Sequence, residues 1–255
     1  MQIYVGTSGY SYSDWKGKFY PNDLPDSQRL SYYSEKFNSV EVNMTFYRTP
    51  FKNVVRGWYS RTPQGFRFVC KGARYITHIQ RLKTNFDSID KFFSPLSELK
   101  EKLICILWQL PPSLKYDLSL LKDFFALVKE HRSGKNLLHA IEFRNATWFK
   151  EKTYEILEHY QIAFVWQDAP KGKWPQTPEV STGNAIYIRF HGKESLYKGS
   201  YSDEDIKYWI NKIKKHQQGL RFLFVFFNND YNADGAFDAI RFKQHLLSEG
   251  IQTHQ

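Results

Sequence analysis

The sequence is poor in cysteine and contains no long apolar run. Its 255 residues include only two cysteines, Cys70 and Cys105, and each lies inside an apolar, strand-like segment. Two such residues build no disulfide framework and their spacing matches no zinc site, so we expect two reduced thiols in the core. No apolar stretch is long enough to cross a membrane, and the N-terminus lacks a basic segment followed by an apolar one. We therefore expect a soluble, cytoplasmic protein with no membrane partner.

Several catalytic motifs are also absent. The chain contains no Walker-type phosphate loop, no GxGxxG after a strand, no HExxH and no GxSxG. Their absence argues against P-loop, Rossmann dinucleotide, zincin and α/β-hydrolase chemistry. With 14 glycines and 10 prolines there is no low-complexity linker either, and we expect a single domain over residues 1–255.

Acidic residues are missing from one long window, residues 42–86. This window holds nine lysines and arginines, which account for most of the formal net charge of +10. Aromatic side chains, among them Phe51, Trp58 and Tyr75, are interleaved with these cations. Such a composition is typical of a surface that binds anions or stacks single-stranded nucleic acid. A solvated helix face over ordinary core aromatics explains it equally well, so both interpretations stay open.

Apolar, strand-like segments alternate with helical ones along the whole chain. The strands are expected at residues 3–6, 39–43, 66–71, 103–110, 138–144, 162–168, 185–191 and 222–229, and helical spacing is clearest at 29–37, 87–101, 118–130, 152–159 and 203–216. This alternation predicts an α/β fold, a (β/α)8 TIM barrel, with a doubly wound open sheet as the alternative. Three prolines in residues 169–184 predict that a loop replaces the outer helix between strands 6 and 7.

The strand at residues 138–144 ends in charge. Side chains alternate between the faces of a strand, so Ala140, Glu142 and Arg144 share one face, and Ile141 and Phe143 share the other. If both faces are covered, as in a parallel sheet, a carboxylate and a guanidinium have left water, which is costly unless they are paired or used. The other strands also end in polar residues, and a barrel brings these ends to one mouth, where the active site of the fold lies.

The polar strand ends supply candidates for catalysis and for substrate binding. Candidate acids, bases and nucleophiles are Glu41, Lys71, Glu142, Asp168 and His191. Arg144 and Arg189 are expected to clamp a planar anion, because guanidinium groups bind carboxylate and phosphate in a bidentate way. Further candidate substrate contacts are Asn43, Tyr47, His78, Gln109, Asn228 and Asn229.

Three alternatives remain open for these residues. Glu142 and Arg144 can instead be an internal ion pair that only holds the barrel together. His78 can be a surface residue, and adjacent asparagines are common in turns. A divalent ion held by Glu41, Glu142, Asp168 and His191 is conceivable, but neighbouring cations compete for the carboxylates, so cofactor-free chemistry is expected.

The motifs together resemble the YecE-like family, also called domain of unknown function 72. The likeness spans nearly the whole chain and rests on Gly6–Gly9, Trp15, Gly17, Phe19–Pro21, Val40–Asn43, Phe46, Tyr47, Phe66, Phe68, Lys71, Thr77, His78, Gln109–Pro112, Glu142–Arg144, Trp148, Asp168, Pro170, Arg189, His191, Gly192 and Phe227–Asn229. It implies a TIM barrel and supports the mouth constellation, but it supplies no reaction. Two positions depart from the family pattern: Tyr10 replaces a tryptophan, and Asn145 replaces a histidine.

Three kinds of function are compatible with the sequence. The first is a cofactor-independent acid–base enzyme, an isomerase, lyase or hydrolase, acting on an anionic, hydroxyl-rich small molecule such as a sugar phosphate. The second is a nucleic-acid-binding or repair-type protein that uses the basic, aromatic window at 42–86. The third is a non-catalytic anion-binding module. Sequence alone gives neither the substrate nor the oligomeric state.

Overall fold

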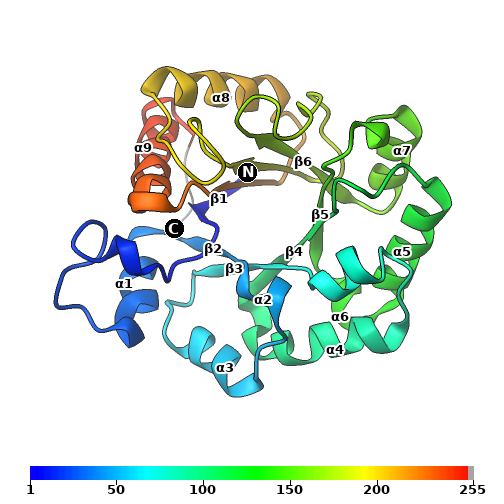
Figure 1. Cartoon of the computed structure of the whole chain (residues 1–255), viewed down its shortest axis with the longest axis horizontal. Helices are drawn as coiled ribbons and strands as arrows, with labels where there is room; N and C mark the ends of the chain where they lie inside the picture. Colours follow the sequence, from blue (N-terminus) through cyan, green and yellow to red (C-terminus); the bar gives the residue numbers. More distant parts are fainter. Residues whose placement is uncertain (252–255) are drawn as a thin grey trace.

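The computed structural model describes residues 1–251 and shows parallel strands arranged in a ring with helices around it (Figure 1). The strands form one eight-stranded sheet in the order β1-β8-β7-β6-β5-β4-β3-β2. Their bounds are β1 Gln2–Thr7, β2 Ser39–Val42, β3 Arg67–Lys71, β4 Leu103–Gln109, β5 Leu138–Glu142, β6 Ile162–Asp168, β7 Ala185–Phe190 and β8 Phe222–Phe227. The predicted TIM barrel is confirmed, and each strand lies within two residues of its expected place.

The ring closes between β1 and β2 mainly through side chains. The two strands share one isolated bridge, Ser8 with Glu41. Below it, the Tyr33 hydroxyl accepts a hydrogen bond from the Thr7 amide at 2.8 Å and donates one to the Ser39 carbonyl at 3.2 Å. The Asn38 amide lies lower still, where it bonds to both Ile3 and Val5 backbone groups. A hydroxyl and an amide therefore take the place of a regular ladder at this seam.

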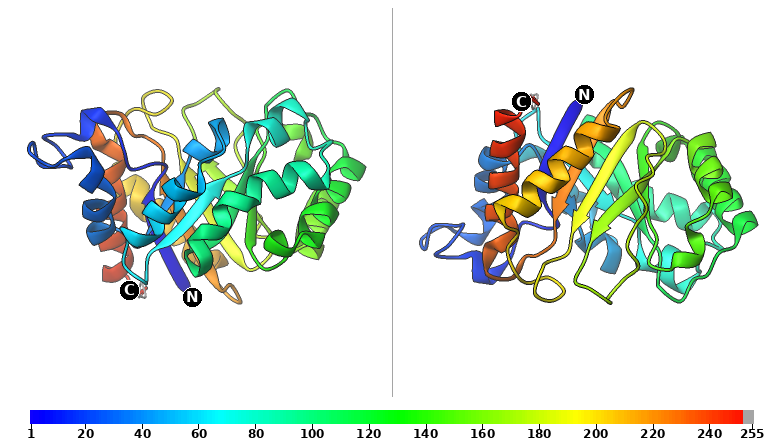
Figure 2. Two further views of the ribbon diagram at one scale, coloured as in Figure 1. Left: turned by 90° about the horizontal axis from the view of Figure 1, so that it is seen from below. Right: turned by 90° about the horizontal axis from the view of Figure 1, so that it is seen from above.

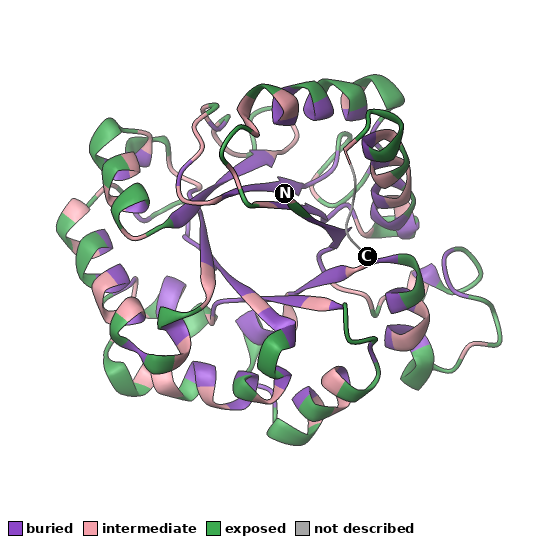
Figure 3. Ribbon diagram, turned by 180° about the vertical axis from the view of Figure 1, so that it is seen from behind, coloured by how far each residue is buried: buried purple, intermediate pink, exposed green. Residues whose placement is uncertain are grey.

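Two apolar clusters fill the inside and the outside of the barrel. Alternate strand residues such as Val69, Leu107 and Val165 pack inside the ring, and their neighbours pack outward against the helices. Colouring by burial shows the strands buried and the helices exposed mainly on their outer faces (Figure 3). The period-two alternation in the sequence therefore separates inward from outward side chains, as a parallel barrel requires.

The helices cover the outside of the barrel (Figure 2). Their bounds are α1 Arg29–Lys36, α2 Met44–Tyr47, α3 Lys52–Ser60, α4 Phe86–Leu96, α5 Leu118–Glu130, α6 Arg132–Lys135, α7 Glu151–His159, α8 Asp203–His216 and α9 Asp234–Ser248. The helix expected at 87–101 ends earlier, at Leu96, and continues as a 3-10 segment in which Lys100 has a φ of 49°. Helices α3 and α9 were not among the helices predicted from apolar spacing.

A proline-containing loop runs between β6 and β7, as predicted. Residues 169–184, all of which the structure describes, contain no helix. The loop is fixed along the outer side of β6, where the Thr182 hydroxyl accepts from the Phe164 amide at 3.0 Å and donates to the Ile162 carbonyl at 2.7 Å. Thr177 and Val180 also bond to β6. Side-chain hydroxyls thus hold in place the segment that occupies the position of a helix.

Within residues 1–251, no helix combines the length and the apolar character needed to span a bilayer.

Candidate functional site

Polar side chains from the carboxyl ends of the strands point into the barrel and meet at its mouth. The inward set is Glu41 of β2, Lys71 of β3, Gln109 of β4, Glu142 of β5, Gln167 of β6 and Arg189 of β7, all of which are buried. Apart from Glu41, which follows Ser39, each occupies the next inward position above an inward residue of the inner apolar cluster. The structure therefore brings several of the strand-end candidates together inside the barrel.

Arg189 lies between two carboxylates at the centre of this set. Its Nε and Nη2 donate to the two Glu41 oxygens at 3.0 and 2.6 Å, and its Nη1 donates to Glu142 Oε2. All three side chains are fully buried. Arg144 Nε donates to the other Glu142 oxygen at 2.6 Å. We call Glu41, Glu142, Arg144 and Arg189 the charge network; it balances two negative against two positive charges.

Two hydroxyl groups complete the surroundings of Glu41. Ser8 Oγ donates to Oε1 at 2.6 Å, and Tyr187 Oη donates to Oε2 at 2.5 Å. Burial, together with the nearby Glu41 carboxylate, raises the pKa of the Tyr187 phenol well above its usual value, so the phenol stays protonated as a donor. Glu41 thus accepts hydrogen bonds on both oxygens, as a buried carboxylate requires.

The arginines decide the ionisation of Glu142. Burial opposes its ionisation, but Arg144 and Arg189 outweigh burial and hold the pKa of Glu142 well below its usual range. The pKa of Arg189 is raised despite its burial, because Glu142 and Glu41 face it. Glu142 and Arg189 are therefore both ionised in the neutral range, and Glu142 is not a proton donor there.

Lys71 is the cation whose charge is easiest to change. Its ammonium lies over the Phe46 ring, 4.4 Å from the ring centroid, and it is almost fully buried. Burial and the positive charge of Arg189 lower the pKa of Lys71 to about 7, although Glu142 and Glu41 act in the opposite direction. A lysine in this state exchanges protons near neutral pH and is nucleophilic when deprotonated.

Arg144 and His191 are covered by one aromatic side chain, Trp174 of the 169–184 loop. The Arg144 guanidinium lies 3.6 Å from the centroid of the Trp174 ring, and the His191 ring meets Trp174 edge-on at 4.6 Å. Asn228 Nδ2 donates to His191 Nδ1 at 3.1 Å, which places the imidazole proton on Nε2, 3.8 Å from Glu142. Burial and Arg189 hold the pKa of His191 well below its usual value, so the ring is neutral.

Three predicted site residues lie away from the charge network. Asp168 continues the outward-facing series of β6, and its side chain approaches Lys193 and α8. Asn229 also faces outward and donates to Asp238 of α9 at 2.7 Å, so it anchors a helix. Asp168 and Asn229 were expected to converge with Glu142, but strict alternation puts both on the outward face of their strands. Tyr47 instead lies on helix α2, where it is 77% exposed.

Other candidates lie near the charge network without belonging to it. Asn43 is half-buried above Glu41, and its Nδ2 donates to the Ser8 carbonyl at 3.4 Å. Gln109 is buried and bonded to the Leu110 carbonyl. His78 is half-buried beside Phe46, and burial together with Lys71 lowers its pKa to about 4. Arg189 was expected to clamp a substrate anion, but its guanidinium already binds Glu41 and Glu142 and is not open to a further anion.

Four residues of the site were not among the sequence candidates: Ser8, Gln167, Trp174 and Tyr187. Strict alternation places Gln167 inward instead of Asp168. It also puts Tyr187 on the same face as Arg189, but Tyr187 was not among the predicted site residues. Trp174 had no signal, because a loop side chain has no periodicity that predicts its direction. Of the metal-binding set considered from sequence, Asp168 points away, and among the described residues no three histidine, cysteine or acidic side chains group as metal ligands.

Comparison with known proteins finds one family over the whole chain. The model of "Protein of unknown function DUF72" matches residues 4–255. The chain is 28% identical to UPF0759 protein YunF of Bacillus subtilis (strain 168), over 92% of this chain and 91% of YunF. A solved DUF72 family protein from Thermotoga maritima MSB8 is 31% identical, with a TM-score of 0.85 over 97% of this chain and 100% of the other.

More distant solved structures share the barrel. A sugar phosphate isomerase/epimerase from Parabacteroides distasonis ATCC 8503 has a TM-score of 0.56 at 13% identity, covering 96% of this chain and 93% of that one. SacUVDE has a TM-score of 0.58 at 8% identity, covering 99% and 100%. At these identities the likeness is one of fold alone.

Proposed function

The chain belongs to the DUF72 family, whose description gives no activity, and from its own site we propose that it is a cofactor-independent acid–base enzyme acting at the barrel mouth. Its substrate is an anionic, hydroxyl-rich small molecule such as a sugar phosphate. The reaction is of the isomerase, lyase or hydrolase type. One observation carries the proposal: Lys71, with a pKa near neutrality, is buried beside a charge network assembled from three other strand ends.

A purely structural network is a poor explanation for this arrangement. Removing ionised groups from water costs several kcal/mol each, and buried ion pairs are often no more stable than apolar packing of the same volume. Four such groups and a lysine at the usual active-site end of a barrel are expected where their charges are used. The network gives Lys71 a fixed electrostatic environment, and Arg144 leaves its terminal nitrogens free of hydrogen bonds within the described residues.

We assign roles from these positions. Lys71 transfers a proton as general base and acid, and Arg144 with Lys71 contacts the anionic group of the substrate. Arg189 and Glu41 position Glu142, which orients Arg144. The neutral His191 offers its Nε2–H, and the Asn43 and Gln109 amides are available to substrate hydroxyls.

Exchange of carbon-bound hydrogen with solvent tests the proposal without knowledge of the product. The protein is incubated in D2O with a panel of sugar phosphates, and proton NMR follows the loss of signals next to a carbonyl group. Wild type is expected to exchange at least one compound; Lys71→Met is expected to abolish the exchange, and Glu142→Gln to reduce it by about a hundredfold or more. Lys122→Met, which changes an exposed lysine of α5, is the matched control.

Two results decide against this enzyme. If Lys71→Met and Glu142→Gln exchange as fast as wild type while remaining folded, the site is wrong. If wild type binds sugar phosphates at Arg144 but shows no exchange and no hydrolysis, the third interpretation, a non-catalytic anion-binding module, replaces the enzyme.

A second candidate function, nucleic-acid binding, is favoured by exposed aromatic side chains beside the mouth. Tyr47, Phe51 and Tyr75 are 77%, 79% and 56% exposed, and Arg48 and Arg74 adjoin them in sequence and are exposed too. Aromatic faces with cations between them fit stacked bases and phosphates. By contrast, Trp58, Phe66 and Phe68 of the same window are buried core residues, as the plainer interpretation of the window expected.

Salt dependence tests this candidate. Single-stranded oligonucleotides are expected to bind with an affinity that falls steeply as salt rises, and Arg48→Glu with Arg74→Glu is expected to weaken binding at every sequence. Arg132→Glu, at an exposed position of α6, is the control. Arg56 and Arg61 are unsuitable for the test because Arg56 pairs with Glu98 and Arg61 bonds to Ser27. Absence of binding at low salt would exclude this function.

A further inference from the structure

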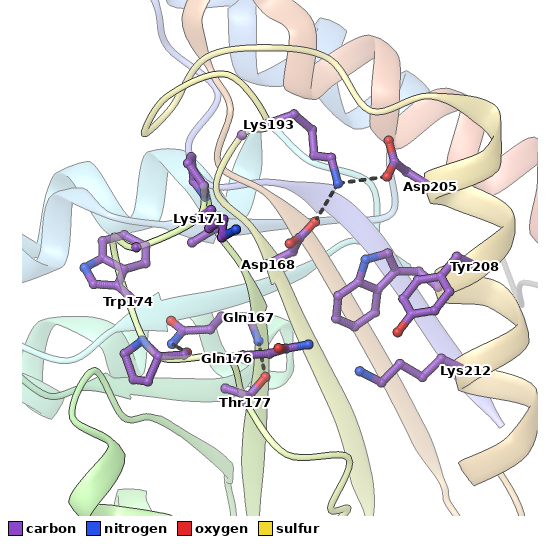
Figure 4. A pocket seen from close by; sticks show the side chains of 16 residues that line it. Gln167, Asp168, Lys171, Trp174, Gln176, Thr177, Lys193, Asp205, Tyr208 and Lys212 are labelled. Carbon is purple, nitrogen blue, oxygen red and sulfur yellow. Dashed lines mark hydrogen bonds and ion pairs between the residues drawn. The ribbon is translucent and has the colours of Figure 1, made fainter.

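A cavity of about 530 Å³ lies beside the charge network, between the 169–184 loop and α8 (Figure 4). It exists because the segment between β6 and β7 is a loop and leaves space in front of α8. Its aromatic lining is Trp174, Tyr208 and Trp209. Trp174 also covers Arg144, so one side chain contributes both to this cavity and to the network. The volume is in the range of cavities that hold small molecules.

The polar lining offers hydrogen-bond acceptors that the protein does not satisfy. Gln167 is only 5% exposed, and its Oε1 has no hydrogen-bond partner within residues 1–251. Asp168 Oδ2 is buried and also lacks such a partner in the described chain; Lys193 Nζ lies 3.6 Å from it and prefers Asp205, at 2.8 Å. Buried acceptors of this kind are normally paired. A ligand for this cavity must therefore bring donors.

The charged side chains that line the cavity indicate which kind of hydrogen-bond donor the ligand carries. The lining holds the two carboxylates of Asp168 and Asp205 and the ammonium groups of Lys171, Lys193 and Lys212, a surplus of one positive charge. Lys193 pairs with both carboxylates, and Lys212 pairs with Glu179 outside the lining. A cationic amine would meet this positive surplus, whereas hydroxyl groups donate without bringing charge. The aromatic side chains meanwhile provide flat apolar surfaces. Hydroxyl donors on an apolar ring are the chemistry of a cyclic sugar.

We propose that this cavity is a binding subsite for a sugar ring, whose hydroxyls donate to Asp168 and Gln167 and whose apolar face packs on the aromatic lining. The inference rests on the proposed function for the class of ligand, a hydroxyl-rich molecule. It adds to that function where the ligand binds and that the ligand contains a sugar ring. Asp168 then has a binding role at the rim, separate from the proton transfer at Lys71.

Saturation-transfer NMR with free hexoses, pentoses and glucuronate tests the subsite without any turnover. Wild type is expected to bind at least one of these sugars. Asp168→Ala removes an acceptor and is expected to weaken binding about tenfold or more. Tyr208→Ala removes a 57% exposed side chain and is also expected to weaken binding, whereas Tyr231→Ala, which removes one that is 51% exposed and outside the cavity lining, is expected to change nothing.

The outcomes separate this subsite from the proposed enzyme. Binding that is lost in Asp168→Ala and Tyr208→Ala but kept in Glu142→Gln supports the subsite, whatever the exchange experiment gives. Binding that is lost only in Glu142→Gln overturns it, because the sugar then sits on the charge network. Absence of sugar binding in wild type, or binding of nucleosides in place of sugars, overturns it too. Circular dichroism verifies folding, and if Asp168→Ala is unfolded, Tyr208→Ala decides.

Discussion

Arg189 keeps two buried carboxylates, Glu41 and Glu142, in one place. Replacing it with a neutral side chain of similar length leaves both carboxylates buried without their shared partner. We expect Arg189→Met to lower the free energy of unfolding by about 3–5 kcal/mol in urea denaturation, and the triple variant with Glu41→Gln and Glu142→Gln to recover part of the loss. If Arg189→Met lowered the free energy of unfolding by less than about 1 kcal/mol, the two carboxylates would have to be hydrated in the folded protein.

Lys71 provides a second prediction for a single residue. In the folded protein its pKa is about 7, whereas an unfolded lysine titrates near 10.4. Carbon-13 reductive methylation followed by NMR should therefore show one lysine signal that titrates near neutrality and disappears in Lys71→Arg. If every lysine signal titrates above about pH 10, Lys71 is not the proton-transfer group.

The depressed pKa of Lys71 also fixes the sign of its effect on stability. The unfolded state binds more protons than the folded state between about pH 7 and 10.4, so the free energy of unfolding rises with pH in that window. Below it, the folded protein carries the full cost of a buried ammonium. Lys71→Met is accordingly expected to stabilise the protein at neutral pH while it abolishes the proposed chemistry, a trade seen at functional sites.

The alternation of side chains along the strands predicts which strand residues face the site. Glu41, Glu142 and Arg189 face inward, as the alternation along their strands predicts. Asp168 and Asn229 face outward because the alternation continues through the polar strand ends, so only one of two adjacent polar residues can face the inside of the barrel. Which partner each charge would choose was beyond prediction, since pairing depends on distances between strands.

At the scale of elements, the seam between β1 and β2 depends on Tyr33 of α1. Its hydroxyl bonds to the Thr7 amide and the Ser39 carbonyl, and both backbone groups are buried. Tyr33→Phe leaves them without this partner, so we expect the free energy of unfolding to fall by about 1–3 kcal/mol in urea denaturation. Tyr32→Phe, in the same helix, removes a hydroxyl with no hydrogen bond in the described chain and should cost far less. Equal losses for the two variants would contradict this account of the seam.

The helices and the loop show what patterns do and do not predict at this scale. Helix α8 was predicted with both its bounds, and the structure shows that a Ser202–Asp205 capping box and an apolar stripe fix it. The loop at 169–184 was predicted from its prolines. Helix α3 was not predicted, because its short amphipathic stretch lies inside the basic window at 42–86 and has no side-chain cap. The seam had no signal at all, since a hydroxyl that replaces a backbone partner leaves no period in the sequence.

For the whole molecule, buried neutral histidines predict sensitivity to acid. Trp108 Nε1 donates to His139 Nδ1, and His139 Nε2 donates to the Gly134 carbonyl. Burial and Lys129 lower the pKa of His139 to about 3, and the pKa of His191 is lowered as well. Each such group has a pKa near 6.5 when unfolded, so the unfolded state binds more protons and stability falls as the pH drops below about 6.5.

Urea denaturation at a series of pH values measures this effect. His139 should make the free energy of unfolding fall at roughly 1.4 kcal/mol per pH unit between about pH 6 and about pH 4, and His191 should add to the fall. His139→Gln should reduce that slope by about one histidine's share. A free energy that stays level over this range would show that both rings are protonated in the folded protein.

The bridge between Ser8 and Glu41 links the closing of the ring to the making of the site. Glu41 is at once the residue through which the first two strands meet and the main partner of Arg189. A chain whose N-terminal strand has not yet docked therefore lacks the contact of Ser8 with Glu41 and has an incomplete charge network. If the proposed function is correct, such a chain is expected to be inactive until β1 has docked.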